Sequence, residues 1–221
     1  MGLEECQIRA EAEWIEGWRN GPQYIRWDEV PVQVSDKAPE ATVLDTSGQK
    51  VSMSSLWADG PALILFWRHY GCGCGLDRNK RLQSEVDRYR ALGASVTIVG
   101  QGEPEQAIEY RKRYEVPVPI LSDPERTAYR AFAVLEGLPS QILFDASQDL
   151  LRRDLSAGLN FASERKTIGR PPVNSPWQLP AEFVVDSSGV VRLTYRYQYC
   201  EDFPDHRVIA ATLEACREGV S

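Results

Sequence analysis

The sequence predicts an α/β fold with a parallel sheet core and helices around it. Three observations lead to this prediction. An apolar run without alternation stands at residues 61–67, amphipathic and β-branched segments alternate from residue 61 to about 135, and two late strands flank a Ser-Ser-Gly turn. Strands buried on both faces have continuous apolar runs, and β-α-β-α alternation is typical of a parallel sheet. We therefore expect a central mixed sheet, with a late antiparallel hairpin added to the parallel part.

The N-terminal segment predicts a helix outside this core. Residues 3–20 place leucine, isoleucine and tryptophan at helical spacing, and Asn20-Gly21-Pro22 ends the pattern. We assign residues 1–35 to a helical extension that covers the main domain, residues 36–221, or a partner.

The main domain is read from its periodicity and turn signals, element by element. We expect a hairpin at 42–44 and 50–52, a buried strand at 61–67, a helix at 76–93, a strand at 94–102, a helix at 104–116, an extended segment at 117–123, a short helix from Pro124 to 135, a long surface insertion at 137–179, an antiparallel hairpin at 181–199 and a final helix at 206–218.

Composition narrows the class of function. The net charge is −7 and no block of lysine and arginine is present, which argues against a nucleic-acid partner. No apolar run reaches the roughly 20 residues that span a bilayer, and the acidic N-terminus lacks the features of a secretory signal. Five scattered cysteines do not form the framework of a small secreted fold. We expect a soluble cytoplasmic protein with no membrane partner.

The stretch "LILFWRHYGCGCGLD", residues 63–77, carries the most specific signal. Together with "APEATVLDTSGQKVSMSSL", the run from Val99 to Phe132 and "WQLPAEFVVDSSGVVR", it resembles the peroxiredoxin-like branch of the alkyl hydroperoxide reductase/thiol-specific antioxidant (AhpC/TSA) family. The resemblance covers about residues 36–215 and implies a thioredoxin-like fold. It also implies a peroxide or disulfide substrate and a thiol reductant as partners, with a homodimer as a further option.

Several positions depart from the family pattern. Gly75 stands where many relatives have the second cysteine of a Cys-x-x-Cys motif, and the second cysteine here is Cys74. Leu65 and His69 replace the proline and threonine that precede the peroxidatic cysteine of typical peroxiredoxins. Their late arginine is also missing, because Gln178-Leu179-Pro180 stands there. The usual residues that activate peroxide are therefore absent from their usual positions.

The cysteine turn joins a buried strand to a helix, and this placement favours reactive sulfur. A thiolate at a helix N-terminus is stabilised by unpaired backbone N–H groups and by the helix dipole, and Arg68 and a protonated His69 would add positive charge. We expect Cys72 to be the nucleophile and Cys74 the resolving thiol, in a cycle that requires no cofactor. The glycines at 71, 73 and 75 would bend the backbone through positive φ. The alternative is a pair of inert thiols in a tight turn.

Four further residues are assigned by position. The resemblance implies that the peptide bond before Pro180 is cis and that Pro180 faces the cysteines, with an ordinary trans proline at the start of a strand as the alternative. Trp67, Tyr70 and Trp177 are candidates for the walls of a substrate cleft, with core packing as the alternative.

Cys200 follows the last strand and returns to the end of the sheet that carries Cys72. It would resolve Cys72 or act as a third ligand, with a lone thiol at the end of a strand as the alternative. A competing hypothesis follows, in which Cys72, Cys74 and Cys200, with His69 or His206, bind zinc or a [2Fe–2S] cluster. A third hypothesis is a non-catalytic module that binds a partner through the Trp-rich N-terminal helix.

Overall fold

The computed structural model describes residues 2–144 and 174–218. Its elements, in chain order, are α1 (Leu3–Asn20), β1 (Thr42–Leu44), β2 (Lys50–Ser52), the 3₁₀-helix η1 (Met53–Trp57), β3 (Ala62–Phe66), α2 (Gly73–Ala91), β4 (Ser95–Gly100), α3 (Pro104–Arg113), β5 (Ile120–Ser122), α4 (Thr127–Ala131), the π-helix η2 (Ser140–Phe144), β6 (Ala181–Val185), β7 (Val191–Arg196) and α6 (His206–Glu218).

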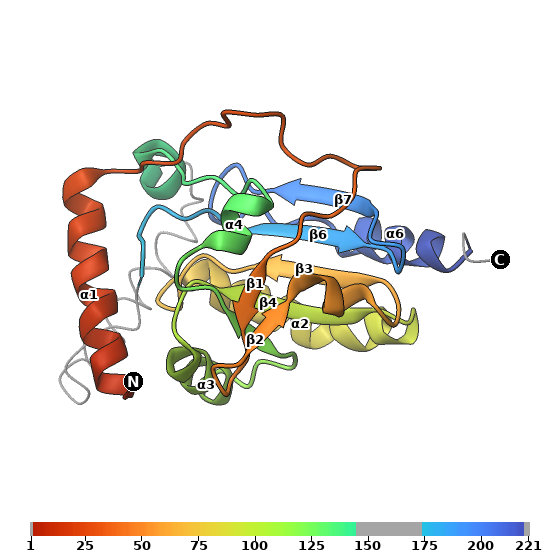
Figure 1. Ribbon diagram of the computed structural model, residues 1–221, viewed down its shortest axis with the longest axis horizontal. Coiled ribbons are helices and arrows are strands. Elements are labelled where there is room, and N and C mark those ends of the chain that lie inside the picture. Colours follow the sequence, from red (N-terminus) through yellow and green to blue (C-terminus); the bar gives the residue numbers. More distant parts are fainter. Residues whose placement is uncertain (1, 145–173, 219–221) are drawn as a thin grey trace.

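One mixed sheet of seven strands forms the centre, in the order β2-β1-β5-β4-β3-β6-β7 (Figure 1). β3 pairs parallel with β4 and antiparallel with β6, and all five of its residues are buried. This explains the unbroken apolar run, because both faces of a central strand lie under helices or loops. β6 and β7 form the expected antiparallel hairpin, so β7 lies two places from β3. The predicted α/β class and mixed sheet are confirmed.

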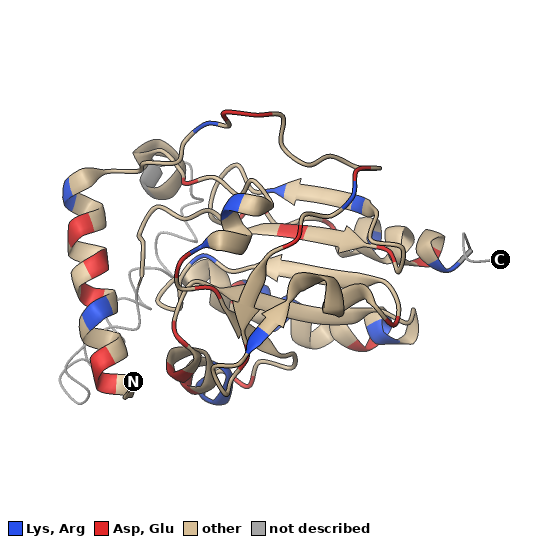
Figure 2. Cartoon of the chain, viewed as in Figure 1, with Lys and Arg blue, Asp and Glu red and all other residues tan. Residues whose placement is uncertain are grey.

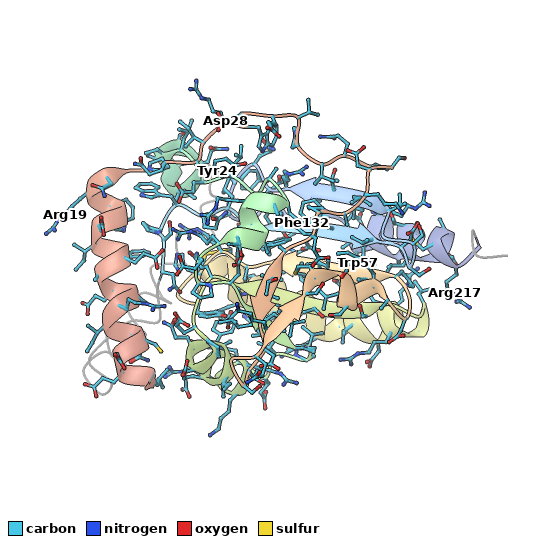
Figure 3. The ribbon with its side chains drawn as sticks, viewed as in Figure 1. Arg19, Tyr24, Asp28, Trp57, Phe132 and Arg217 are labelled. Carbon is cyan, nitrogen blue, oxygen red and sulfur yellow. A yellow bond between two sulfur atoms is a disulfide. The ribbon has the colours of Figure 1, made fainter. Side chains whose placement is uncertain are left out.

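Each face of the sheet has its own core. On one face, Leu82, Val86 and Tyr89 of α2 pack with Leu213 of α6 against the strands. On the other, Phe132 follows α4 and contacts Phe66 and Phe183, with ring centroids 5.1 and 5.0 Å apart (Figure 3). Two apolar layers of this kind provide most of the burial that stabilises an α/β domain.

The helix predicted from Pro124 to 135 is shorter than expected. Pro124 and Glu125 form a turn, Arg126 takes positive φ (54°), and α4 spans only Thr127–Ala131. The carboxylate of Asp123 accepts hydrogen bonds from the N–H groups of Thr127, Ala128 and Tyr129, so the helix begins where those donors are satisfied. Burial raises the pKa of Asp123, and these hydrogen bonds oppose the shift.

The expectation of a cis peptide bond before Pro180 is also wrong, because none of the described peptide bonds is cis. The backbone N–H groups of Gly137 and Leu179 donate to the carbonyls of Trp177 and Leu135. These bonds hold the incoming chain extended, and it continues straight into β6. Most of the predicted insertion, 145–173, lies outside the described residues.

The helix α1 stands at one end of the sheet and runs across it (Figure 1). Its bounds agree with the predicted 3–20, and Gly21 follows with φ of 69°. Acidic residues recur along its length (Figure 2). None of the described helices is long and apolar enough to cross a bilayer.

Candidate active site

The two cysteines of the turn lie together at the beginning of α2. Cys72 is the N-cap residue, its Sγ accepts a hydrogen bond from the backbone N–H of Cys74 (3.3 Å), and a disulfide joins the two side chains. Both are buried, with 2% and 3% of their surface exposed. The sulfur of Cys72 therefore lies where helix N–H groups and the helix dipole favour negative charge.

Arg68 connects this sulfur to a second segment. Its Nη1 donates to Cys72 Sγ (3.1 Å) and its Nη2 donates to the carbonyl of Pro176 (2.6 Å), while the side chain is 5% exposed. Within the described part of the chain, Nε of Arg68 is buried and has no hydrogen-bond partner. A fixed guanidinium on the sulfur favours the thiolate of reduced Cys72, and the remaining Nε–H is a donor that an incoming oxygen can satisfy.

His69 does not supply the positive charge expected of it. Burial, and then the charge of Arg68, hold the pKa of His69 well below its usual value, so the imidazole is neutral. Its Nδ1 accepts a hydrogen bond from the N–H of Gly71 (3.2 Å), and its ring forms a T-shaped pair with that of Trp14, with ring centroids 5.3 Å apart. His69 thus shapes the turn, and the local positive charge comes from Arg68.

The three glycines of the turn do not adopt a left-handed backbone, and Gly75 is required by packing. The described glycines with positive φ are Gly21, Gly48, Gly93 and Gly189, so the expected positive φ at 71, 73 and 75 is wrong. A Cβ on Gly75 would lie 2.7 Å from Nε1 of Trp67 and 3.2 Å from the hydroxyl of Tyr110. Gly75 therefore lets the first turn of α2 lie directly against these side chains.

The three aromatic candidates for a cleft are all buried. Trp67 donates from Nε1 to the hydroxyl of Tyr110 (3.2 Å) and belongs to the core beneath α2. Tyr70 also lies in this core, 4.8 Å from the ring of Tyr110. Trp177 belongs to the apolar cluster that includes Cys72, Cys74 and Cys200. Of the three, Trp177 shares a cluster with all three sulfur atoms.

Pro180 and Cys200 share a small cavity with Cys74. Both line a cavity of about 10 Å³, roughly the space of one water, together with Cys74 and Arg78. Cys200 is 1% exposed and present as a thiol. The hairpin thus returns Cys200 to the active-site end of the sheet, as its position in the sequence indicates.

A buried charge network beside this cavity was missed by sequence reasoning. Arg78 donates to both carboxylate oxygens of Glu182 (2.7 and 3.1 Å) and to Glu85 (2.9 Å), and Tyr197 donates to Glu182 (2.6 Å). The carboxylates raise the pKa of Arg78 well above its usual value, against the effect of burial. The available signal was Glu182 within the apolar run "AEFVV", because a buried carboxylate requires a partner.

The helix α1 covers this end of the molecule. Trp18 contacts Trp177 with ring centroids 4.6 Å apart, and Trp177 donates from Nε1 to the carbonyl of Gly17 (2.6 Å). Gly17 abuts Pro176 so closely that a Cβ would lie 2.6 Å from its Cδ. The tryptophans that the third hypothesis assigned to a partner therefore pack against the chain's own site.

Polar contacts also connect α1 to the cysteine turn. Arg126 forms an ion pair with Glu13 and donates to Oε1 of Gln101 (3.2 Å). The Gln101 amide in turn donates to the carbonyl of Arg68. The position of α1 and the position of the Arg68 backbone are thus linked through two side chains.

Across the described residues, no group of three or more histidine, cysteine, aspartate or glutamate side chains has the arrangement of a metal site. Cys72 and Cys74 are joined to each other, and a disulfide sulfur is not a thiolate ligand. His206 lies at the start of α6, where its Nδ1 is 3.7 Å from Asp205. The geometry that the structure shows at this turn is that of a dithiol–disulfide pair.

Comparison with known proteins agrees with this geometry. A sequence model of the AhpC/TSA family matches residues 34–194. The thioredoxin-like protein AAED1, chloroplastic, of Arabidopsis thaliana is 28% identical over 104 residues, which span 47% of this chain and 42% of that protein.

Solved structures show the same fold at low identity. Peroxidoxin BcpB of Mycobacterium tuberculosis superposes with a TM-score of 0.58 at 18% identity, covering 83% of this chain and 97% of that one. A thiol peroxidase of Chromobacterium violaceum has a TM-score of 0.55 at 17% identity and covers 90% of this chain and 93% of that one. Peroxiredoxin 5 of Alvinella pompejana has a TM-score of 0.55 at 14% identity and covers 85% of this chain and 99% of that one. The expected thioredoxin-like fold is confirmed.

Proposed function

The chain belongs to the AhpC/TSA family, and we propose that it is a thiol-dependent oxidoreductase that reduces a peroxide or a disulfide by cycling Cys72 and Cys74 between dithiol and disulfide. The observation that carries the proposal is the disulfide at the start of α2, with the guanidinium of Arg68 hydrogen-bonded to Cys72 Sγ. A redox pair needs one sulfur that ionises readily and a second within bonding distance, and this turn provides both.

With a peroxide, the thiolate of Cys72 attacks the O–O bond and becomes a sulfenic acid, while the other oxygen leaves as water or an alcohol after taking a proton. The thiol of Cys74 then attacks this sulfur, the S–S bond forms, and the sulfenic oxygen leaves as water. With a disulfide substrate, Cys72 attacks one sulfur, the substrate S–S bond breaks, and the first substrate thiol leaves as a mixed disulfide forms. Cys74 then attacks Cys72 and releases the second substrate thiol. In either case the substrate gains two electrons and an external thiol reductant later restores the dithiol.

Arg68 has a defined part in both routes. Its Nη1 stabilises Cys72 as the attacking and as the departing thiolate. Its Nε–H, which has no partner among the described residues, supports the peroxide route in particular, because a peroxide or sulfenate oxygen would accept a hydrogen bond from it. The proposed cycle uses sulfur alone, without a metal or organic cofactor, and fits a reducing compartment such as the cytoplasm.

The test is turnover coupled to consumption of a thiol reductant, with hydrogen peroxide and a small disulfide as separate substrates. Cys72→Ser is expected to abolish turnover, whereas Cys216→Ser, which alters a buried thiol of α6, is expected to retain it. Full activity of a folded Cys72→Ser variant would refute the proposal. The ratio of the two activities identifies the substrate class.

A further inference from the structure

A third sulfur lies beside the redox pair, on the side of Cys74. Cys72, Cys74 and Cys200 belong to one buried cluster, closed by Trp177, Leu179 and Ile142. Cys74 and Cys200 both line the cavity that has room for about one water, whereas Cys72 does not. Cys200 is therefore placed to meet the disulfide from the sulfur of Cys74.

The two ends of the disulfide differ as leaving groups. If a thiolate attacks Cys74, the sulfur that leaves is Cys72, which keeps the hydrogen bond from Arg68 (3.1 Å) and the N–H of residue 74 (3.3 Å). If it attacks Cys72, the sulfur that leaves is Cys74, for which the structure shows no guanidinium donor among the described residues. Thiol–disulfide exchange is faster when the leaving thiolate is the better stabilised one.

The burial of the disulfide also favours attack by Cys200 over attack by an external thiol. The disulfide is almost fully buried, and α1 packs over this end of the sheet through Trp14 and Trp18. An external thiol must displace part of this cover, whereas Cys200 already lies in the same apolar cluster. Attack within one chain is favoured by proximity over attack by a dissolved reductant.

We infer that Cys200 is a relay thiol that takes over the disulfide from Cys72. In this step Cys200 loses its proton and attacks Sγ of Cys74, the Cys72–Cys74 bond breaks, and a Cys74–Cys200 bond forms while Cys72 leaves as a thiolate. No net oxidation occurs, and one proton is released. The inference rests on the proposed function, since it needs the Cys72–Cys74 disulfide as its starting point. The relay has a consequence for the cycle. Cys72 is again a nucleophilic thiolate while the chain still holds a disulfide, between Cys74 and Cys200.

The experiment maps disulfides in the full-length protein after oxidation with diamide, rapid alkylation and proteolysis without reductant. In Cys72→Ser, a Cys74–Cys200 cross-linked peptide is expected, and it should disappear in the Cys72→Ser/Cys200→Ala double variant. Cys72→Ser/Cys216→Ala is the matched control and should retain it. In the oxidised wild type, a fraction of molecules should carry an alkyl label on Cys72, and Cys200→Ala should lose that fraction.

The outcomes separate this inference from the proposed function. If wild type forms the Cys72–Cys74 disulfide but Cys72→Ser never forms the Cys74–Cys200 bond, the relay is refuted and the redox pair stands. If oxidised wild type forms neither a Cys72–Cys74 nor a Cys74–Cys200 disulfide, the proposed function itself fails. Circular dichroism of each variant confirms that a missing cross-link does not reflect unfolding.

Discussion

Replacing Arg68 by methionine should make Cys72 a slower nucleophile by a predictable amount. The variant keeps an unbranched apolar stem but removes the donor 3.1 Å from Cys72 Sγ. A hydrogen bond to a charged group contributes about 1.5–3 kcal/mol, which corresponds to about a 10- to 150-fold smaller thiolate fraction of reduced Cys72 at neutral pH.

The observed rate should fall by less than this. A more basic thiolate is intrinsically more nucleophilic, with a Brønsted coefficient of about 0.4–0.5. This gain offsets roughly half of the loss in thiolate fraction on a logarithmic scale. The expected decrease in the alkylation rate at pH 7 is about 3- to 20-fold, and the inflection of the rate–pH profile should move to higher pH.

The assay is iodoacetamide alkylation of fully reduced protein over a pH series, with Cys72 modification followed by peptide mass. Arg68→Lys retains positive charge but not the paired donors, and it should lie between wild type and Arg68→Met. Arg88→Met, at an exposed arginine of α2, is the control. An unchanged rate and inflection in folded Arg68→Met would refute the assignment of Arg68.

Three further changes test the surroundings of the site. Gly17→Val places side-chain atoms against Pro176, and an overpacking cost of about 1–3 kcal/mol should loosen α1 and speed reduction of the disulfide by dithiothreitol. Glu182→Gln leaves buried Arg78 without its principal counter-charge and should lower the free energy of urea unfolding by about 3–5 kcal/mol. His69→Asn keeps an acceptor for the neighbouring N–H but cannot titrate, so its stability should depend less on pH between 7 and 5 than that of wild type.

The direction of the pH effect follows from the lowered pKa of His69. As the pH falls below about 6.5, the unfolded chain binds a proton at this histidine and the folded chain does not, so wild type should lose up to about 2 kcal/mol by pH 5. His206→Asn, at a half-exposed histidine, is the control. An equal loss in wild type and His69→Asn would contradict the neutral assignment.

For the other two variants, the opposing results are equally direct. Reduction kinetics of Gly17→Val identical to those of Arg19→Val, which alters an exposed residue of α1 (Figure 3), would show that α1 does not limit access. A Glu182→Gln variant as stable as wild type would show that Arg78 is held adequately by Glu85 alone.

Local patterns predicted most of the framework. The apolar run at Ala62–Phe66 predicted a strand buried on both faces, and the turn at Ser187–Gly189 predicted the hairpin that returns Cys200. The position of Cys72 at a helix start followed from the order of strand, turn and amphipathic segment. These features depend on residues close in sequence, where periodicity and turn chemistry are informative.

The features that were missed depend on residues far apart in sequence. Arg78 and Glu182 are separated by 104 positions, and nothing in either segment specifies the partner. The charge state of His69 depends on burial beneath Trp14, which no local pattern reveals. The cis geometry expected for the peptide bond before Pro180 depends on a resemblance to a family. The sequence gives no sign that the segment before Pro180 pairs with Leu135.

The bonds of Arg78 set a boundary within α2. Its two hydrogen bonds to Glu182 fix the helix to β6 one turn after Cys74, and its third goes to Glu85 within α2. Before that point the helix begins Gly-Cys-Gly, and each glycine costs about 0.5–1 kcal/mol of helix stability relative to alanine. Fraying that accompanies the opening and closing of the sulfur bridge is therefore confined to the first turn. The sulfurs can change partners while the rest of the scaffold keeps its shape.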